Sequence, residues 1–240
     1  MNRFFVAAGA ASLVLGISAL AAADPTVTVT PTSAHPGDAV VVSVVGATEM
    51  PQGKAGGAPL HFFVAKRGYQ ALYAVALDVN EDHILVEVAG KPISVPIVKK
   101  TFPETKVIVE EEMANPDKAD RERIDADNKA MGESYAKASG VPQFTHPFKR
   151  PPGATTSGFG EWRTFNDGHR SQHLGLDLGV SEGAKVLASN AGTVALVRDT
   201  FLAGNVVVIA HGGGISTLYF HLQKATWTLR WRWGPVVRPV

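Results

Sequence analysis

The sequence contains no cysteine. This absence excludes disulfide bonds, thiolate zinc ligands, a cysteine nucleophile and a lipoprotein anchor, and it leaves the redox compartment undecided. The chain also lacks an excess of charge of either sign, because its formal net charge is only +1. Such a balance gives no indication of nucleic-acid binding. With 240 residues, of which 45% are hydrophobic, the chain can bury a core in one large or two small domains.

Beyond the N-terminus, no apolar run approaches the length of a membrane span. At the N-terminus, Asn2 and Arg3 precede an apolar run that ends at Leu20, and small residues follow in A-x-A spacing. A basic start, an apolar centre and such a site predict a signal peptide at residues 1–23, cut before Asp24. The alternative, an uncleaved anchor, is disfavoured by the glycine and serine residues inside the run. We therefore expect a periplasmic or secreted protein with no stable membrane span after cleavage.

Residues 24–102 predict a small antiparallel β-sandwich-like domain. Short apolar segments are separated there by turn residues, at 26–30, 39–45, 60–64, 72–77, 84–88 and 93–98. The glycine-rich stretch 53–58 is expected to be a loop. No motif in this domain indicates catalysis.

Residues 103–143 are predicted to be a linker that contains a charged helix. Residues 107–109 could form one more strand, and residues 117–138 are rich in Asp, Glu, Lys and Arg. With Ile124 and Met131 as its main apolar positions, this helix should be solvated, and Gly140 and Pro142 are suitable stop residues.

Residues 144–240 predict a second, β-rich domain. Apolar segments at 186–188, 192–197 and 205–209 have the length and composition of strands. Three consecutive glycines at 212–214 predict a hairpin turn into a further strand at 215–222. The fold class expected for the whole chain is therefore mostly β, with two antiparallel domains and a helical linker.

The stretch His173-Leu174-Gly175-Leu176-Asp177 is the most plausible metal site. In an extended chain the His and Asp share one face, while Leu174, Leu176 and Leu178 share the other, which we expect to be core. A straight strand would separate the two α-carbons by about 13 Å, at roughly 3.3 Å per residue. Bonds of about 2 Å to one zinc ion need a closer approach. The backbone must therefore bend, and Gly175 can bend at little steric cost. A hydrogen-bonded surface pair is the alternative interpretation.

A second candidate lies in the strand predicted at residues 215–222. Alternation places Thr217, Tyr219 and His221 on one face, opposite Leu218, Phe220 and Leu222. This arrangement predicts that His221 lies on a polar, cleft-like side of the strand beside a tyrosine. A structural histidine without a catalytic role is the alternative.

Six motifs in order resemble the lysostaphin/LytM-type zinc metallopeptidases, which cut peptidoglycan cross-bridges. They are TSGFG at 156–160, FN at 165–166, HLGLD at 173–177, GTV at 192–194, HG at 211–212 and LYFHL at 218–222. The resemblance implies an antiparallel β metallopeptidase domain at residues 144–240 that acts on peptidoglycan peptides.

The resemblance also implies roles for individual residues. His173 and Asp177 would be ligands of one Zn²⁺ ion, and His221 would steady the oxyanion of the transition state. Asn166 and Tyr219 would line the substrate groove. A catalytic zinc needs three protein ligands and an open position for water, and a nearby base must take the proton of that water.

In the family, the third ligand and the base come from one late H-x-H motif, and that motif is absent here. None of the eight histidines follows Leu222, and no two of them have H-x-H spacing. Three of the four tryptophans fall instead in the tail after Lys224. We hypothesise that the reading frame shifts just after Lys224, so that the domain is incomplete after residue 222 and lacks its last strands. The alternative is that the tail is a genuine strand of this lineage.

Three interpretations of function follow. The first is a secreted zinc endopeptidase of peptidoglycan with impaired hydrolysis. The second is a non-enzymatic module that binds cell wall or activates a partner hydrolase. The third, a β-rich binding protein unrelated to zinc, is disfavoured by the ordered motifs. By the resemblance, non-enzymatic relatives usually lose the ligands of the first motif, and both His173 and Asp177 are present here.

Overall fold

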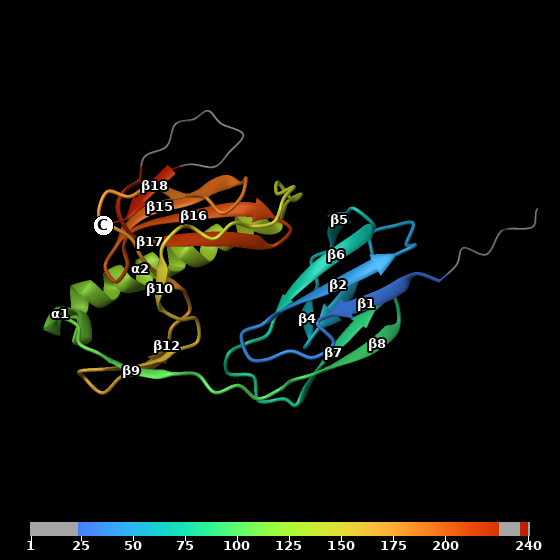
Figure 1. Ribbon diagram of the computed structural model, residues 1–240, viewed down its shortest axis with the longest axis horizontal. Helices are drawn as coiled ribbons and strands as arrows, with labels where there is room; N and C mark the ends of the chain where they lie inside the picture. The colour runs from blue at the N-terminus through green and yellow to red at the C-terminus, as the bar shows by residue number, and fades with distance from the viewer. Residues whose placement is uncertain (1–23, 226–235, 240) are drawn as a thin grey trace, which may run out of the picture.

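The computed structural model describes residues 24–225 and 236–239. The signal peptide predicted at residues 1–23 and most of the tail after Lys224 lie outside the described residues. Within the described part, no helix combines the length and the apolar character that crossing a membrane requires. Two β-rich parts lie end to end (Figure 1), and the prediction of a mostly β, antiparallel fold is confirmed.

The first part is a sandwich of two four-stranded antiparallel sheets, ordered β1-β2-β6-β5 and β4-β3-β7-β8. Valines alternate inward along β2, where Val40, Val42 and Val44 are almost fully buried. They pack against Val86 and Val88 of the facing sheet, because β-branched side chains suit a half-buried pleated surface. The strands are β1 (Thr26–Thr30), β2 (Ala39–Val45), β3 (Gly53–Ala55), β4 (Ala58–Pro59), β5 (Phe63–Ala65), β6 (Gly68–Ala74), β7 (His83–Val88) and β8 (Lys91–Pro96).

The expected glycine-rich loop at 53–58 is wrong, because this stretch forms the hairpin of β3 and β4. Gly53 of β3 pairs with Val88 of the neighbouring strand β7. A Cβ at Gly53 would lie only 2.7 Å from the carbonyl oxygen of Glu87. Glycine therefore allows two backbones to approach closely here. The adjoining Ala55 is fully buried.

The predicted linker begins with a strand, β9 (Glu104–Val107), that joins a sheet of the second part. Two helices follow, α1 (Glu111–Ala114) and α2 (Lys118–Tyr135), and then a 3-10 turn, η1 (Ala136–Ser139). The side chain of Asp117 caps α2 by accepting a hydrogen bond from the backbone N–H of Asp120 at 2.9 Å. The expected helix is thus present.

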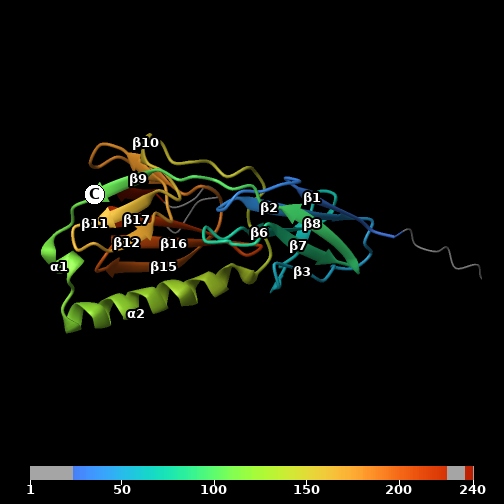
Figure 2. The same ribbon diagram turned by 90° about the horizontal axis from the view of Figure 1, so that it is seen from below.

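Helix α2 runs along the outermost strand of the largest sheet (Figure 2), so it is not solvated all round. Asp127 is only 2% exposed. Its Oδ1 accepts from Arg198 Nε at 2.5 Å, and its Oδ2 accepts from the backbone N–H of Phe201 at 2.9 Å. The prediction of a fully solvated helix is wrong at this position, because a buried carboxylate ties the helix to the sheet.

The second part contains a five-stranded antiparallel sheet ordered β14-β18-β17-β16-β15. Residues 206–209 of β16 are fully buried at its centre. The glycine triplet at 212–214 has positive φ throughout and forms the predicted turn between β16 and β17. The strands are β14 (Val186–Leu187), β15 (Thr193–Thr200), β16 (Gly204–Gly212), β17 (Ile215–Ala225) and β18 (Val236–Pro239).

Two small sheets complete this part and carry the candidate site. One pairs β10 (Ala154–Ser157) with β13 (Asp177–Gly179). The other has the order β12-β11-β9, from β11 (Trp162–Phe165) and β12 (Arg170–Gln172), with β9 parallel to β11.

Candidate metal centre

The backbone bends at Gly175, as predicted, between the end of β12 and the start of β13. The bend brings His173 Nε2 to 3.2 Å from Asp177 Oδ1. A Cβ at Gly175 would lie 3.3 Å from that same Nε2 atom. The missing Cβ of Gly175 therefore leaves space beside the imidazole nitrogen.

The leucines of this stretch do not form a core face, and that prediction is wrong. Leu174 is 78% exposed and Leu176 is 43% exposed. Alternation requires a straight strand, and the bend at Gly175 breaks it. The leucines therefore border the site on the outside of the protein.

The imidazole of His173 is fixed by the loop that follows β10. Its Nδ1 lies 2.9 Å from the carbonyl oxygen of Gly158, which can only accept a hydrogen bond. The backbone N–H of His173 donates to Glu161 O at 2.8 Å, and the backbone N–H of Gly160 donates to His173 O at 2.8 Å. Since Nδ1 carries the donated proton, the neutral ring presents a lone pair at Nε2.

A lone pair at Nε2 faces a carboxylate oxygen, so a cation has to lie between the two acceptors, either a proton or a metal ion. Two atoms bonded at about 2 Å to a tetrahedral zinc ion lie about 3.3 Å from each other. The distance of 3.2 Å between Nε2 and Asp177 Oδ1 fits that spacing. A backbone carbonyl at the second ring nitrogen is also the usual arrangement around a metal-bound histidine. His173 and Asp177 therefore fit two corners of a zinc site.

The other carboxylate oxygen of Asp177 is bound by Arg163, whose Nη2 lies 2.6 Å from Oδ2. The same Nη2 donates to Ser157 Oγ at 2.8 Å. The Ser157 hydroxyl in turn donates to the carboxylate of Glu161, which also accepts from the hydroxyl of Thr105. These hydrogen bonds, from Ser157 first and then Thr105, lower the pKa of Glu161 from its ordinary value.

Over residues 24–225 and 236–239, no group of three His, Cys, Asp or Glu side chains gathers in a way that could hold an ion. His169 precedes His173 by four residues, but it is exposed and stacks on Phe165 with ring centroids 5.9 Å apart. It faces solvent, as expected from its place in a loop. Of the candidate ligands predicted from the sequence, the structure brings His173 and Asp177 together.

The face predicted for His221 is wrong, because a bulge interrupts β17. Tyr219 pairs with Val207, and Leu222 pairs with Asn205. Two residues of β17 therefore lie between these pairs where β16 has only one, which defines a β-bulge. His221 has a positive φ of 54°, and its backbone N–H donates to Ala203 O at 2.9 Å. Its side chain is exposed. The bulge therefore separates His221 from the face of Tyr219, and its role with the oxyanion stays a prediction.

Tyr219 is 7% exposed and lies inside the protein, not along an open groove. Its hydroxyl accepts from the backbone N–H of Ser189 at 2.7 Å and lies 3.1 Å from Thr217 Oγ1. Thr217 Oγ1 is in turn 2.8 Å from Nε2 of the fully buried His211, whose Nδ1 donates to Ala191 O. Burial lowers the pKa of His211 from its ordinary value, although the bond to Ala191 opposes the shift. This network ties the loop after β14 to β16 and β17.

Asn166 lies in the turn between β11 and β12 and is exposed. Its Oδ1 accepts from the backbone N–H of Val109 at 3.1 Å, so it holds the chain that leaves β9. Its predicted place at the rim of a substrate groove stays a prediction.

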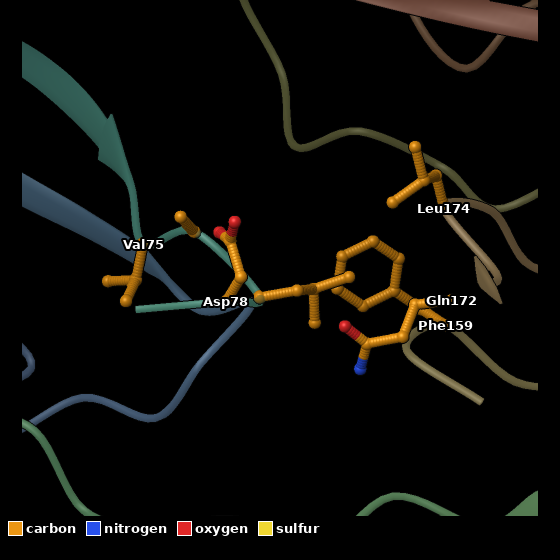
Figure 3. Close-up of a pocket in the computed structure, with 7 residues that line it drawn as sticks. Val75, Asp78, Phe159, Gln172 and Leu174 are labelled. Carbon is orange, nitrogen blue, oxygen red and sulfur yellow. The ribbon is translucent and has the colours of Figure 1, made fainter. Parts of the chain in front are cut away.

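A cavity of about 420 Å³ adjoins the candidate site, between the loop after β6 and the loops that carry His173. Phe159, Gln172 and Leu174 face Val75 and Asp78 across it (Figure 3). Because Gln172 and Leu174 are the chain neighbours of His173, the cavity opens beside the candidate ligand. Its lining is completed by Ala76 and Leu77.

Residues 171–230 match the model of peptidase family M23. This segment resembles the M23 peptidases. The matched segment contains both His173 and Asp177, and the predicted resemblance to lysostaphin/LytM-type peptidases is confirmed.

The chain shares its fold with a solved structure from Pseudomonas aeruginosa, provisionally named peptidase M23. The TM-score is 0.54 at 23% sequence identity, over 85% of this chain and 81% of that one. No curated protein gives a significant match to the chain.

Sequence patterns assigned no role to Arg163, Ser157 or Glu161, although they surround the candidate ligand Asp177. Ser157 pairs with Asp177 across β10 and β13, and Arg163 pairs with Ser171 across β11 and β12. The sequence offered one indication of this role, because Arg163 is a charged residue in an extended segment shortly before the H-x3-D motif. The register of two separate hairpins decides which atoms meet, and the sequence does not specify that register.

Proposed function

We propose that this protein is a periplasmic or secreted endopeptidase of peptidoglycan cross-link peptides, built around one zinc ion and impaired in hydrolysis. The observation that carries the proposal is the approach of His173 Nε2 to Asp177 Oδ1 at 3.2 Å, with the ring proton directed away to Gly158 O. The match of residues 171–230 to the M23 family model supports peptidase activity. The metal, the substrate and the compartment are part of the proposal.

In this proposal, His173 Nε2 and Asp177 Oδ1 hold the ion. When bound, zinc would supply a water that ionises near neutral pH and would polarise the scissile carbonyl. Gly158 O keeps the imidazole in the tautomer that leaves Nε2 free, and Arg163 engages the second oxygen of Asp177. The residues of the chain thus orient both donors before an ion arrives.

A cavity of about 420 Å³ beside His173 supports binding of a short peptide. The exposed Leu174 and Phe159 offer apolar contact there, and Asp78 offers a carboxylate to a substrate amine. Clefts of several hundred Å³ with a few polar groups are typical of ligand sites.

Impairment is proposed because the described residues bring together two ligands where a catalytic zinc uses three. The sequence has no histidine after Leu222 that could serve as the base. Loss of a general base lowers rates by about 10²–10⁴-fold. We expect zinc binding that is weaker than in a complete centre, and slow cleavage.

The proposal is tested by measuring zinc content and the digestion of purified peptidoglycan with the same preparations. Wild type should bind up to one zinc ion per chain, and both Asp177→Asn and His173→Ala should bind none. In a further variant, the residues after Lys224 are replaced by the continuation in the alternative reading frame. If that frame encodes H-x-H, the rate of peptidoglycan digestion should rise at least about 100-fold. A wild type that binds no zinc under these conditions would overturn the proposal.

A second candidate is a non-enzymatic module that binds cell wall or activates a partner hydrolase, and the two-ligand centre favours it. Co-sedimentation with insoluble peptidoglycan separates the two candidates. If Asp177→Asn sediments like wild type and the tail replacement restores no cleavage, the module is correct. Sequencing the coding DNA decides independently between a shifted frame and a genuine tail.

A further inference from the structure

The carboxylate of Asp177 is divided between two partners of different character. Its Oδ2 lies 2.6 Å from Arg163 Nη2, and its Oδ1 lies 3.2 Å from His173 Nε2. A carboxylate that is free to rotate could present either oxygen, or both, to an ion. In this structure a charge-assisted hydrogen bond engages one oxygen and leaves the other facing the imidazole.

Arg163 is itself held in place. Its side chain is 23% exposed, and the nitrogen that reaches Asp177 also donates to Ser157 Oγ at 2.8 Å. Ser157 sits opposite Asp177 in the β10–β13 pair, and its hydroxyl is oriented by the carboxylate of Glu161. Residues from three strands therefore converge on the position of one carboxylate.

We propose that Arg163 is a positioning residue that makes Asp177 a one-oxygen metal ligand. Its guanidinium holds Oδ2, so that only Oδ1 is presented to an ion shared with His173. Partners of this kind, outside the ligand set, orient metal ligands and change metal affinity by about 10–100-fold. The role in metal binding rests on the proposed function, whereas the orientation of Asp177 does not.

Arg163 also brings a positive charge close to the ion, and this opposes binding. If that repulsion were the larger effect, removing the charge would tighten metal binding. The geometry favours orientation, because one nitrogen satisfies both Ser157 and Asp177 while Oδ1 is left open. The sign of the affinity change therefore separates a positioning residue from a competing cation.

The test uses the full chain with Arg163→Gln, Arg163→Lys and the control Arg170→Gln. Arg170 is a matched control because it pairs with Glu104 at 3.2 Å and stacks on Trp162, on the same hairpin but without a contact to Asp177. Lysine can place one nitrogen near both Asp177 and Ser157, whereas glutamine keeps the polarity of the side chain and loses its charge.

The first measurement is the crystal structure of each variant without metal. We expect Asp177 to rotate away from His173 in Arg163→Gln, and to stay within about 0.5 Å of its place in Arg163→Lys and Arg170→Gln. An unchanged Asp177 in Arg163→Gln would overturn the proposal, whether or not the wild type binds metal. Thermal unfolding verifies that each variant is folded.

The second measurement is titration with Co²⁺, followed by calorimetry and by visible absorption, which reports the coordination geometry. We expect Arg163→Gln to bind Co²⁺ about 10–100-fold more weakly with an altered spectrum. Arg163→Lys should recover much of the loss, and Arg170→Gln should match wild type. Equal or tighter binding by Arg163→Gln would overturn the positioning role. A wild type that binds neither Co²⁺ nor Zn²⁺ would overturn the proposed function and leave the orientation of Asp177 to be decided by the crystal structures.

Discussion

Replacing Asp127 by asparagine should detach helix α2 from the sheet and lower the free energy of unfolding by about 2 kcal/mol. The amide oxygen of asparagine can still accept from the backbone N–H of Phe201. Its NH₂ group then faces Arg198 Nε, so two donors meet where the wild type has a donor and an acceptor. Removing one partner of a fully buried ion pair costs about 3–5 kcal/mol. We expect less here, because the side chain of Arg198 is 37% exposed and solvent screens its charge.

The same variant predicts a pH dependence. Burial acts to raise the pKa of Asp127, but the hydrogen bonds from Phe201 and Arg198 outweigh it and hold the pKa below its ordinary value. A carboxyl whose pKa is lower in the folded state stabilises the fold above its unfolded pKa of about 3.9. This stabilisation is lost as the pH falls through the folded value. The difference between wild type and Asp127→Asn should therefore be constant from pH 5 to pH 8 and shrink below about pH 4.

Urea unfolding followed by circular dichroism measures both effects. Asp199→Asn is the control, because Asp199 pairs with Arg123 at 3.1 Å and both side chains are largely exposed. Such pairs contribute about 0–1 kcal/mol. If Asp127→Asn lost no more stability at pH 7 than the control, the reasoning from burial would be refuted.

Three further variants test the site and its support. Gly175→Ala should weaken Co²⁺ binding by at least about 10-fold at nearly unchanged thermal stability, because its Cβ would lie 3.3 Å from His173 Nε2 and the metal needs that space; unchanged Co²⁺ affinity would contradict this. Tyr219→Phe should lower the stability by about 1–3 kcal/mol, because it leaves the half-buried N–H of Ser189 without its acceptor; a variant that lost only peptidoglycan binding would instead place Tyr219 in the groove. Burial lowers the pKa of His211 in the folded state. The contribution of His211 to the free energy of unfolding is therefore fully present above its unfolded pKa of about 6.5 and falls as the pH drops below that value. Urea unfolding at pH 7.5 and pH 5.5 should therefore show a smaller pH effect in His211→Gln than in wild type, and equal effects would refute the assignment.

The bend at Gly175 could be predicted from the sequence, because the hypothesis of a shared zinc ion requires metal–ligand bonds of about 2 Å. Two ligands of one ion must approach within a few ångströms, and an extended segment of five residues cannot allow this. Glycine at the middle position then located the bend. The leucines were misplaced for the same reason, since the alternation that assigned Leu174 and Leu176 to a core assumed a straight strand, and the bend at Gly175 interrupts it.

The positions of Arg163 and His221 could not be predicted, because both depend on pairing between strands. Arg163 reaches Asp177 only through the registers of two hairpins. His221 leaves the face of Tyr219 because β17 gains one extra residue against β16. Bulges shift alternation by one residue, and no local pattern at residues 218–222 marks this one.

The β-sandwich and helix α2 were predictable to within a few residues, since alternating valines and a capped charged segment are local features. The attachment of α2 was not, because Asp127 looks like any other charge on its helix until Arg198 and Phe201 come beside it. Long-range partners of single charged residues are thus the part of this fold that the sequence conceals.

The parallel pairing of β9 with β11 has a consequence for how the protein can be divided. Trp162 to Phe165 would lose their neighbour if the chain were cut at the start of the second predicted domain, near residue 144. Strand β11 would then expose unpaired amides and carbonyls along the edge that β9 had covered, and such an edge is a template for association with other chains. A fragment that begins at residue 144 should therefore aggregate, whereas one that begins before Pro103 should stay monodisperse. As a physical unit, the second part therefore starts about forty residues before the boundary predicted at residue 144.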